Sequence, residues 1–308
     1  MTDVLLDNSG VCTDEVHPDL ETALVAAREM GMRHVELLEF WGKPVVAMDD
    51  AEIQRAKELL GKYGLGVSAI GSLFLKLVQL GQVRPGEVAR DPAFLKDLDV
   101  LLSEIRVAQA LGAPIVRAYS FRRDDMVGMG NPSPRLPRGG EIPDEILKKV
   151  VEGMRIAAGL AGDAGLVLGI ENVRSCWGNS GYNTARIVRA VGHPALKVIW
   201  DPANDYVSGG SPYPEGYEAV RPFMCHVHVK DARVVDPAVG LIAWEAVGRG
   251  EVDYVSQFRA MRRDGYAGTL SLETHWHPRT ASGQPDKVAD SRTSFQGVRA
   301  ALRASLAG

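Results

Sequence analysis

Cysteine and long apolar runs are both scarce in this chain of 308 residues. Its three cysteines, Cys12, Cys176 and Cys225, lie far apart without a CxxC pair, which excludes a disulfide framework and a zinc knuckle. No stretch approaches the roughly 20 apolar residues that a membrane span needs. The first residues, MTDVLLDNSGVCTDEV, also lack the basic flank and apolar run of a signal peptide. We therefore expect a soluble cytoplasmic protein with free thiols and no membrane partner.

An excess of positive charge is missing as well. The chain has 35 Lys and Arg against 39 Asp and Glu, which gives a net charge of -4. Proteins that grip nucleic-acid phosphates are typically basic, so we expect no nucleic-acid partner. Hydrophobic residues make up 45% of the chain and charged residues 24%, as in ordinary globular proteins, and a large core can therefore form.

Short apolar, β-branched runs alternate along the chain with longer segments whose apolar residues recur at i, i+3 and i+4. This alternation is typical of parallel βα units, which build either a closed eight-stranded barrel or a doubly wound sheet. The expected strands are 4–6, 34–38, 66–70, 115–119, 167–172, 197–201, 226–229 and 269–274. The main helical segments are 19–31, 51–64, 94–112, 143–165, 184–192 and 255–268.

The lengths of the connecting loops favour the barrel. Joins from helix to strand are short, such as GMR at 31–33 and LGAP at 111–114. Joins from strand to helix are often long, as at 72–92, 120–142 and 231–251. In a parallel barrel these long joins all open on the carboxyl-end face, where such enzymes carry their chemistry. The sequence therefore predicts a (β/α)8 TIM barrel that forms a single domain over residues 1–308.

Four polar side chains stand near the ends of the last four expected strands: Glu171 in LGIENV, Asp201 in VIWDPAN, His228 in HVHVKD and Glu273 in LSLETHW. Carboxylates that face a dry barrel interior are costly unless they are paired or bind a cation. Oxygen-rich ligation with one nitrogen suits one divalent ion, Mn²⁺ first, with Mg²⁺, Co²⁺ or Zn²⁺ possible. The alternative is a structural carboxylate–histidine network without a metal.

The stretch CHVHVKDAR, residues 225–233, alternates as a strand does, so His226, His228 and Lys230 share one face. The two histidines are two strand rises apart, roughly 6–7 Å. Only His228 is level with the strand-end carboxylates. We expect His226 to lie one layer deeper and to support His228 by hydrogen bonding. Lys230 continues the face outward, where it can meet a substrate oxygen.

In order, these motifs resemble the xylose-isomerase-like TIM-barrel superfamily of sugar (phosphate) isomerases and epimerases. The pattern is Glu…Asp-x-x-(His/Asn)…His-x-His-x-Lys-Asp…Glu, with a GxGxxD-like GRGEVD at 248–253 before the last strand. The resemblance implies that Glu171 and Glu273 exchange a proton with the carbon next to a substrate carbonyl, through a metal-stabilised enediolate. It also implies that Asp201 and His228 complete the metal site.

The chain departs from the superfamily pattern at three positions. Asn204 stands where the ketohexose epimerases and endonuclease IV have histidine; asparagine can bind a sugar hydroxyl but cannot hold an extra zinc. Trp177 replaces a glutamate of the ketohexose epimerases, which suggests a different substrate shape. Arg233 matches the family arginine only one position early. We expect all three residues to contact substrate, but not a tagatose- or psicose-type substrate.

Three further side chains are candidates for substrate binding, each with a structural alternative. Arg117 in PIVRAYS and Glu36 in HVELLEF both point inward on their strands and can bind substrate or pair within the barrel. His275 lies two residues after Glu273, at the rim, where it can contact substrate or support the site.

The sequence thus predicts a metal-dependent sugar isomerase or epimerase with a small-molecule sugar or sugar derivative as its partner. Three alternatives stay open: a dehydratase or lyase acting on a keto-inositol or sugar acid, a non-catalytic sugar-binding barrel, and a trinuclear-zinc endonuclease. Asn204 and the negative net charge argue against the last. A homo-oligomer is possible, and the sequence does not decide it.

Overall fold

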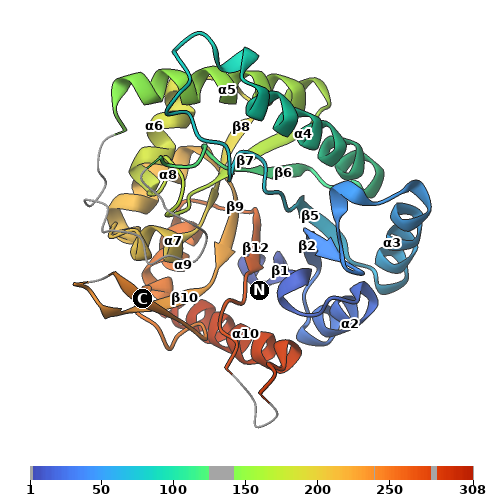
Figure 1. Cartoon of the computed structure of the whole chain (residues 1–308). Helices are drawn as coiled ribbons and strands as arrows, with labels where there is room; N and C mark the ends of the chain where they lie inside the picture. The colour runs from blue at the N-terminus through green and yellow to red at the C-terminus, as the bar shows by residue number, and fades with distance from the viewer. Residues whose placement is uncertain (1–2, 125–141, 239, 279–282, 308) are drawn as a thin grey trace.

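The computed structural model describes residues 3–124, 142–238, 240–278 and 283–307. Eight parallel strands close into a barrel in the order β1-β12-β9-β8-β7-β6-β5-β2, as expected for a TIM barrel (Figure 1). The barrel strands are β1 (Ser9–Cys12), β2 (His34–Leu37), β5 (Gly66–Ile70), β6 (Ile115–Ala118), β7 (Val167–Glu171), β8 (Leu196–Trp200), β9 (Met224–Val229) and β12 (Thr269–Leu272).

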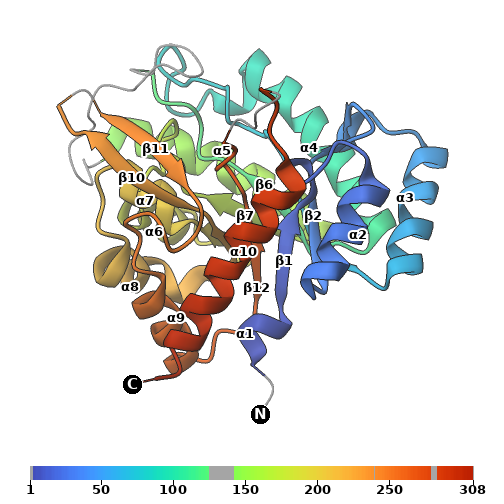
Figure 2. The same ribbon diagram turned by 90° about the horizontal axis from the view of Figure 1, so that it is seen from below.

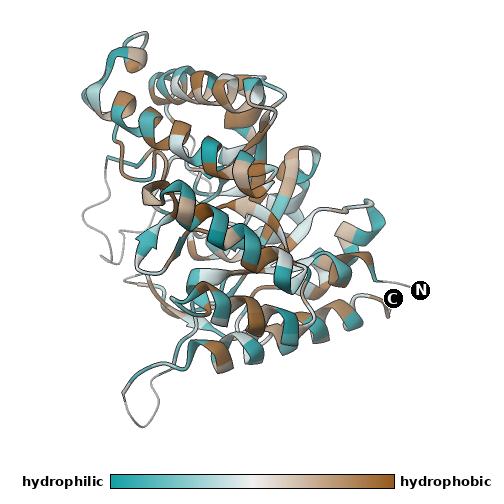
Figure 3. Cartoon of the chain, turned by 90° about the vertical axis from the view of Figure 1, so that its right-hand side faces the viewer, coloured by the Kyte–Doolittle hydropathy of each residue, from teal (hydrophilic) through white to brown (hydrophobic). Residues whose placement is uncertain are grey.

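Helices form a ring outside the strands, and their apolar sides pack against the barrel wall (Figure 1). Hydrophilic and hydrophobic segments alternate along the helices in Figure 3, as amphipathic helices require. None of the helices in the described ranges is both long and apolar enough to cross a membrane. The helices are α1 (Val4–Asp7), α2 (Leu20–Met30), α3 (Asp50–Tyr63), α4 (Pro92–Leu111), α5 (Asp144–Asp163), α6 (Gly181–Val191), α7 (Pro202–Val207), α8 (Tyr217–Val220), α9 (Tyr254–Arg263) and α10 (Lys287–Ala304).

The prediction of a first strand at 4–6 is wrong. These residues form the short helix α1, because the Asp3 side chain accepts a hydrogen bond from Leu6 N and caps the turn. The first barrel strand is β1, which begins at Ser9, five residues after the start of α1. Its second residue, Gly10, has to be small. A Cβ on Gly10 would lie 2.9 Å from the carbonyl oxygen of His34 on β2, so only glycine permits this close pairing.

The other expected strands all exist, with ends that differ by a few residues, and so do the six expected helices. Local sequence explains their boundaries. At the start of α3, Asp49 accepts from Glu52 N while the Glu52 side chain accepts from Asp49 N, a complete capping box. The helix ends at Gly64, whose left-handed φ of 60° closes the last turn. The C-terminal helix α10, which lies across the outside of β1 and β12 in Figure 2, was not among the expected segments.

The join after β9, expected as a long loop, contains an antiparallel hairpin of β10 (Asp231–Asp236) and β11 (Leu241–Glu245). Figure 2 shows this hairpin projecting beside the carboxyl ends of the barrel strands. Asp231 holds the chain that follows the hairpin, since its carboxylate accepts hydrogen bonds from the N–H groups of Gly248, Gly250 and Val252. A smaller hairpin, β3 (Glu39–Phe40) with β4 (Lys43–Pro44), follows β2.

Candidate metal centre

Four adjacent strands, β7, β8, β9 and β12, carry the four predicted ligands to one place inside the barrel mouth. Glu171 ends β7, and His228 lies on β9. Asp201 directly follows β8, where its side chain caps α7 by accepting from Asn204 N. Glu273 directly follows β12 and is aligned by its N–H, which donates to Val229 O at 3.0 Å. One ligand atom from each of the four residues lies within 4.8 Å of the others, and all four residues are buried.

His228 has the hydrogen-bonding arrangement of a metal-ligating histidine. Its Nε2 lies 2.8 Å from Glu36 Oε2, and we place the proton on Nε2 because a carboxylate can only accept. Nδ1 then has a free lone pair; it is buried, has no hydrogen-bond partner, and faces Glu171 Oε1 at 3.4 Å. A histidine that donates one nitrogen to a carboxylate and offers the other to a cation is the usual geometry at metal sites.

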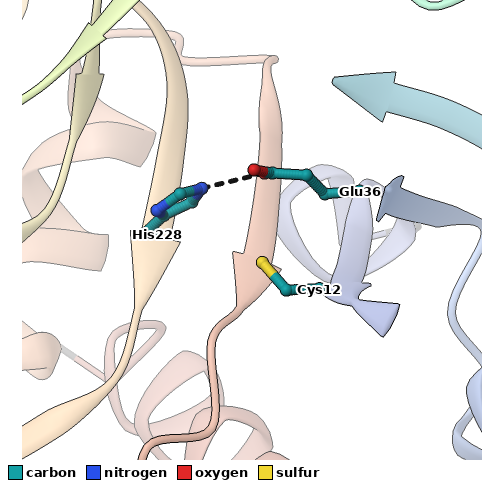
Figure 4. Close-up of side chains that lie close together, drawn as sticks. All are labelled: Cys12, Glu36 and His228. Carbon is teal, nitrogen blue, oxygen red and sulfur yellow. Dashed lines mark hydrogen bonds and ion pairs between the residues drawn. The ribbon is translucent and has the colours of Figure 1, made fainter. Parts of the chain in front are cut away.

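Figure 4 shows the far side of the same imidazole, where Glu36 and Cys12 point toward His228 from β2 and β1. These three residues also bring a possible ligand atom each within 4.8 Å of one another. Burial raises the pKa of the Cys12 thiol well above its usual range, and the negative charge of Glu36 raises it further. Cys12 is therefore a neutral thiol, and Glu36 serves as the carboxylate that orients His228.

The centre holds more negative than positive charge. The carboxylates of Glu36, Glu171, Asp201 and Glu273 face two buried cations, Arg117 and Lys230. Lys230 Nζ lies 2.8 Å from Asp201 Oδ2 and also contacts Glu273; Arg117 Nη1 lies 3.2 Å from Glu36 Oε1. With His228 neutral, as it must be to bind a metal, four carboxylates against two cations leave an excess of two negative charges, which matches one divalent ion.

The pKa values of Asp201 and His228 are both raised, as an excess of negative charge around them would cause. Burial raises the pKa of Asp201, and its neighbours Glu171 and Glu273 add to the rise although Lys230 opposes it. Burial alone would lower the pKa of His228, but the charges of Glu36 and Glu171 outweigh burial and raise it well above its usual range. Without a metal, Asp201 and His228 thus tend to hold protons, whereas Glu171 and Glu273 do not. A divalent cation would supply the same compensation, so the donor set fits this kind of ion.

The two glutamates have different surroundings. Glu171 accepts from the Tyr119 hydroxyl at 3.0 Å and from Asn204 Nδ2 at 2.9 Å, both neutral donors. Glu273 contacts Lys230, and its Oε1 lies 3.6 Å from His275 Nε2. Burial raises the pKa of both carboxyls, but nearby positive charges outweigh it: the pKa of Glu171 falls to about 2, and that of Glu273 falls well below its usual range.

A cavity of about 420 Å³ opens above the centre on the carboxyl-end face. Glu171, Glu273, Asn204, Lys230, Arg117 and His275 all reach it, so these predicted site residues are brought together. The rest of the lining is apolar at Leu38, Leu73, Val173, Val207, Ile242 and Trp244, and polar or charged at Asp14, Glu15, Lys76, Tyr119, Arg174 and Ser175. Pockets of this size with a few convergent polar groups suit small ligands.

Besides the candidate ligands Asp201 and His228, four predicted residues do not line the cavity. Glu36 is buried beneath it and pairs with Arg117 and His228. His226 lies one layer deeper, as expected, but its Nε2 bonds to Ser271 Oγ at 3.0 Å rather than to His228. The two imidazoles meet only edge to face, with centroids 5.5 Å apart.

The other two face elsewhere. Trp177 is only 8% exposed and packs into the hydrophobic core, with the Arg123 guanidinium 4.8 Å from its ring. Arg233 lies on the outer side of β10, where its Nε pairs with Glu245 Oε1 at 2.6 Å. The hairpin explains this placement, because adjacent side chains of a strand point to opposite faces and the loop expected at 231–251 has no such alternation.

The cavity residues that were not predicted include Tyr119, Trp244 and Lys76, and also Asp14, Glu15, Arg174 and Ser175. Tyr119 follows Arg117 by two positions in IVRAYS, so the same alternation that selected Arg117 could have found it. Trp244 reaches the cavity from β11 and meets the His275 ring edge to face, with centroids 4.7 Å apart. Lys76 enters from the join after β5. Nothing in the sequence singles out Trp244 or Lys76, since both depend on how long loops fold.

Comparisons with solved structures find the same architecture at low sequence identity. The probable 3-DHS dehydratase AsbF from Bacillus anthracis is 16% identical, with a TM-score of 0.69 over 95% of this chain and 98% of the other. The 3-keto-D-glucoside 4-epimerase YcjR from E. coli is 16% identical, with a TM-score of 0.65 over 95% and 98%. A xylose isomerase-like TIM barrel protein from Mycobacterium smegmatis in complex with magnesium is 19% identical, with a TM-score of 0.67 over 99% and 100%.

These structural likenesses bear on the fold alone. A search of curated protein sequences gives no significant match. The family described as xylose isomerase-like TIM barrel, however, matches residues 24–297, a range that contains the four candidate ligands. The chain therefore belongs to the xylose isomerase-like TIM barrel family.

Proposed function

We propose that the protein is a divalent-metal-dependent isomerase or epimerase that moves a proton on the carbon next to the carbonyl of a ketose-like sugar. The observation that carries the proposal is the unpartnered, buried Nδ1 of His228, which faces carboxylates in a centre with two excess negative charges. Membership of a family whose fold includes sugar epimerases supports it.

Glu171, Asp201, His228 and Glu273 would hold the cation, with Mn²⁺ as the first expectation. A bound divalent cation would polarise the substrate carbonyl and make the neighbouring C–H more acidic. Arg117 and Lys230 stay beside the carboxylates and limit their mutual repulsion.

Glu171 and Glu273 are the proton carriers of this proposal. Their carboxylates converge on one volume from β7 and from the end of β12, and both reach the cavity in which a sugar would lie. One can remove the α-proton as a carboxylate, while the other must enter the step as a carboxylic acid, so that it can return its own proton to the substrate. The hydrogen bonds from Tyr119 and Asn204 fix the orientation of the Glu171 carboxylate and leave its charge available.

A dehydratase is the second candidate, and Tyr119 is the observation that favours it. Its hydroxyl is buried at the cavity wall and donates to Glu171 Oε2. A phenol at this position could protonate a β-hydroxyl as it leaves, after the same α-proton has been removed. Analysis of the product distinguishes loss of water from a change of configuration or carbonyl position.

The experiment uses full-length protein loaded with Mn²⁺ and a set of ketoses in D₂O, with NMR detection of deuterium at the α-carbon. We expect metal-dependent incorporation that falls by about 100-fold or more in Glu171→Gln and Glu273→Gln, the usual loss of a general acid or base. The exposed Glu58→Gln is the control and should behave as wild type.

Metal binding is measured separately by calorimetry, with Asp201→Asn as the variant that should bind Mn²⁺ more weakly. Wild-type turnover in both glutamate variants would refute the assignment of the proton carriers. A protein that binds no divalent cation would refute the proposed chemistry. Metal and sugar binding without any exchange would instead favour the non-catalytic barrel.

A further inference from the structure

Lys76 is a cavity residue that the proposed proton transfer does not use. It lies in the join between β5 and α4, directly after Leu75, whose φ of 64° is in the left-handed region. For a buried leucine this backbone conformation is strained. It is held in place by Leu75 N, which donates to Asp97 Oδ2 on α4 at 2.7 Å. The fold thus maintains a strained turn next to this lysine.

The Lys76 ammonium lies beside the metal centre without entering it. Its Nζ is 4.6 Å from the centroid of the Tyr119 ring and 3.4 Å from the Tyr119 hydroxyl. That hydroxyl in turn donates to Glu171 Oε2 at 3.0 Å. The ammonium is therefore no more than two hydrogen-bond lengths from a candidate metal ligand.

Within the described ranges, no carboxylate lies within 4.0 Å of Lys76 Nζ. The aromatic ring and hydroxyl of Tyr119 compensate only part of the cost of removing an ammonium from water. Burial accordingly lowers the pKa of Lys76, although the charge of Glu171 opposes this shift. The carboxylates of the metal centre do not supply the missing counter-charge, because Arg117, Lys230 and a divalent ion would balance them.

The neighbouring wall of the cavity adds to the positive charge and provides a hydroxyl. Arg174 and Ser175 follow β7 and line the same cavity as Lys76. Ser175 Oγ contacts Cys176 Sγ at 3.9 Å, which is a weak interaction, and is therefore available to another acceptor. The joins after β5 and β7 thus bring two cationic side chains and a hydroxyl to the cavity, which is the composition of a small anion site, while the acidic Asp14 and Glu15 line the cavity from the join after β1.

We propose that the substrate carries a carboxylate that binds Lys76, so that the protein acts on a ketose acid rather than on a neutral ketose. That the substrate is a ketose rests on the proposed function; the carboxylate is the new part of this inference. The short distance from Lys76 to Glu171 fits a molecule in which a few carbon atoms separate the carboxylate from the reacting carbonyl. A carboxylate fits better than a phosphate, because phosphate sites usually gather several backbone N–H groups, often at glycines, and no described lining residue is a glycine.

The test uses the Mn²⁺-loaded full chain and matched trios of probes that differ only at C6. One trio is D-fructose, D-fructuronate and D-fructose 6-phosphate; the equivalent trios of the other ketohexoses complete the panel. Affinities are measured by calorimetry for wild type, Lys76→Met, Lys76→Arg and the exposed control Lys148→Met, which removes the same charge from α5.

In at least one trio we expect the acid to bind wild type roughly tenfold or more tightly than the neutral sugar and the phosphate, as a charge-assisted hydrogen bond provides. Lys76→Met should abolish the difference, Lys76→Arg should keep part of it, and Lys148→Met should keep all of it. Preference for phosphate, absence of any acid preference, or a preference that survives Lys76→Met would each overturn the proposal.

The same experiment distinguishes failure of the proposed function from failure of this inference. Metal binding and deuterium exchange are measured on the wild type independently of the anion preference. An acid preference that depends on Lys76, without metal binding or exchange, would retain this inference and refute the isomerase. Metal-dependent exchange with neutral sugars alone would retain the isomerase and refute this inference.

Discussion

Glu104 gives a prediction about stability whose size follows from the structure. The residue lies on the inner side of α4 and is only 2% exposed, and its Oε2 has no hydrogen-bond partner. Burial raises the pKa of this carboxyl to about 8, although the Ser72 hydroxyl and the charge of Arg117 lower it somewhat. Glu104 is therefore mostly protonated in the folded protein at neutral pH, whereas it is ionised in the unfolded chain.

The sign of the effect is opposite to that of a salt-bridged carboxylate. Below a pH of 4.5 the group is protonated in both states and costs nothing. As the pH rises from 4.5 to about 8, the unfolded chain releases a proton that the folded protein retains, so stability falls. At pH 7 the loss is about 3 kcal/mol, since each pKa unit corresponds to roughly 1.4 kcal/mol. Gln has the shape of the neutral acid and does not ionise.

Glu104→Gln should therefore stabilise the protein by about 3 kcal/mol at pH 7 and by close to zero near pH 4. Urea denaturation of wild type and variant from pH 4 to pH 8 measures this, with EDTA present so that metal binding does not add its own pH dependence. Glu58→Gln, at an exposed position of α3, controls for the loss of a surface charge. A difference that does not change with pH, or a variant that is less stable at pH 7, would refute the reasoning.

Two other predictions concern the hairpin and the metal centre. Gly250→Ala should destabilise the protein by about 3 kcal/mol in urea denaturation, because a Cβ would lie 2.2 Å from Asp231 Oδ1. The control Gly61→Ala, with nothing within 4 Å of the added Cβ, should stabilise α3 by up to about 1 kcal/mol. Lys230→Met should bind Mn²⁺ roughly tenfold more tightly in calorimetry, because the ammonium competes for Asp201 and Glu273. Weaker binding would show that Lys230 supports the bound cation instead.

The positions of the four candidate ligands could be predicted because they depend on short-range rules. Strand alternation and parallel topology together require that Glu171, Asp201, His228 and Glu273 meet at the carboxyl end of the barrel. The same rules identified Asn204 and Arg117. They also place Tyr119 at the site, since it follows Arg117 by two positions and shares its face of the strand.

Two residues that the family resemblance predicted at the substrate, Arg233 and Trp177, do not line the cavity. Arg233 matches a family arginine one position early, but the segment 231–251 contains a hairpin, which turns this side chain outward toward Glu245. Trp177 was expected to wall the cavity but packs in the core. The segment 4–6 has the apolar character of a strand, yet one capping carboxylate, Asp3, and the steric requirement at Gly10 shift the first strand along the chain.

The two halves of the barrel contribute differently to the centre. Strands β7, β8, β9 and β12 provide the candidate ligands, while β2, β6 and the join after β5 provide Glu36, Arg117, Tyr119 and Lys76. Tyr119 connects the two sets, since one hydroxyl contacts both Glu171 and the Lys76 ammonium. A ligand set can be common to enzymes that share proton-transfer chemistry, and so it cannot by itself select a substrate. Selectivity must then come from groups that meet the rest of the substrate, and Lys76 is a cation that reaches the cavity with no carboxylate of the described residues within 4.0 Å.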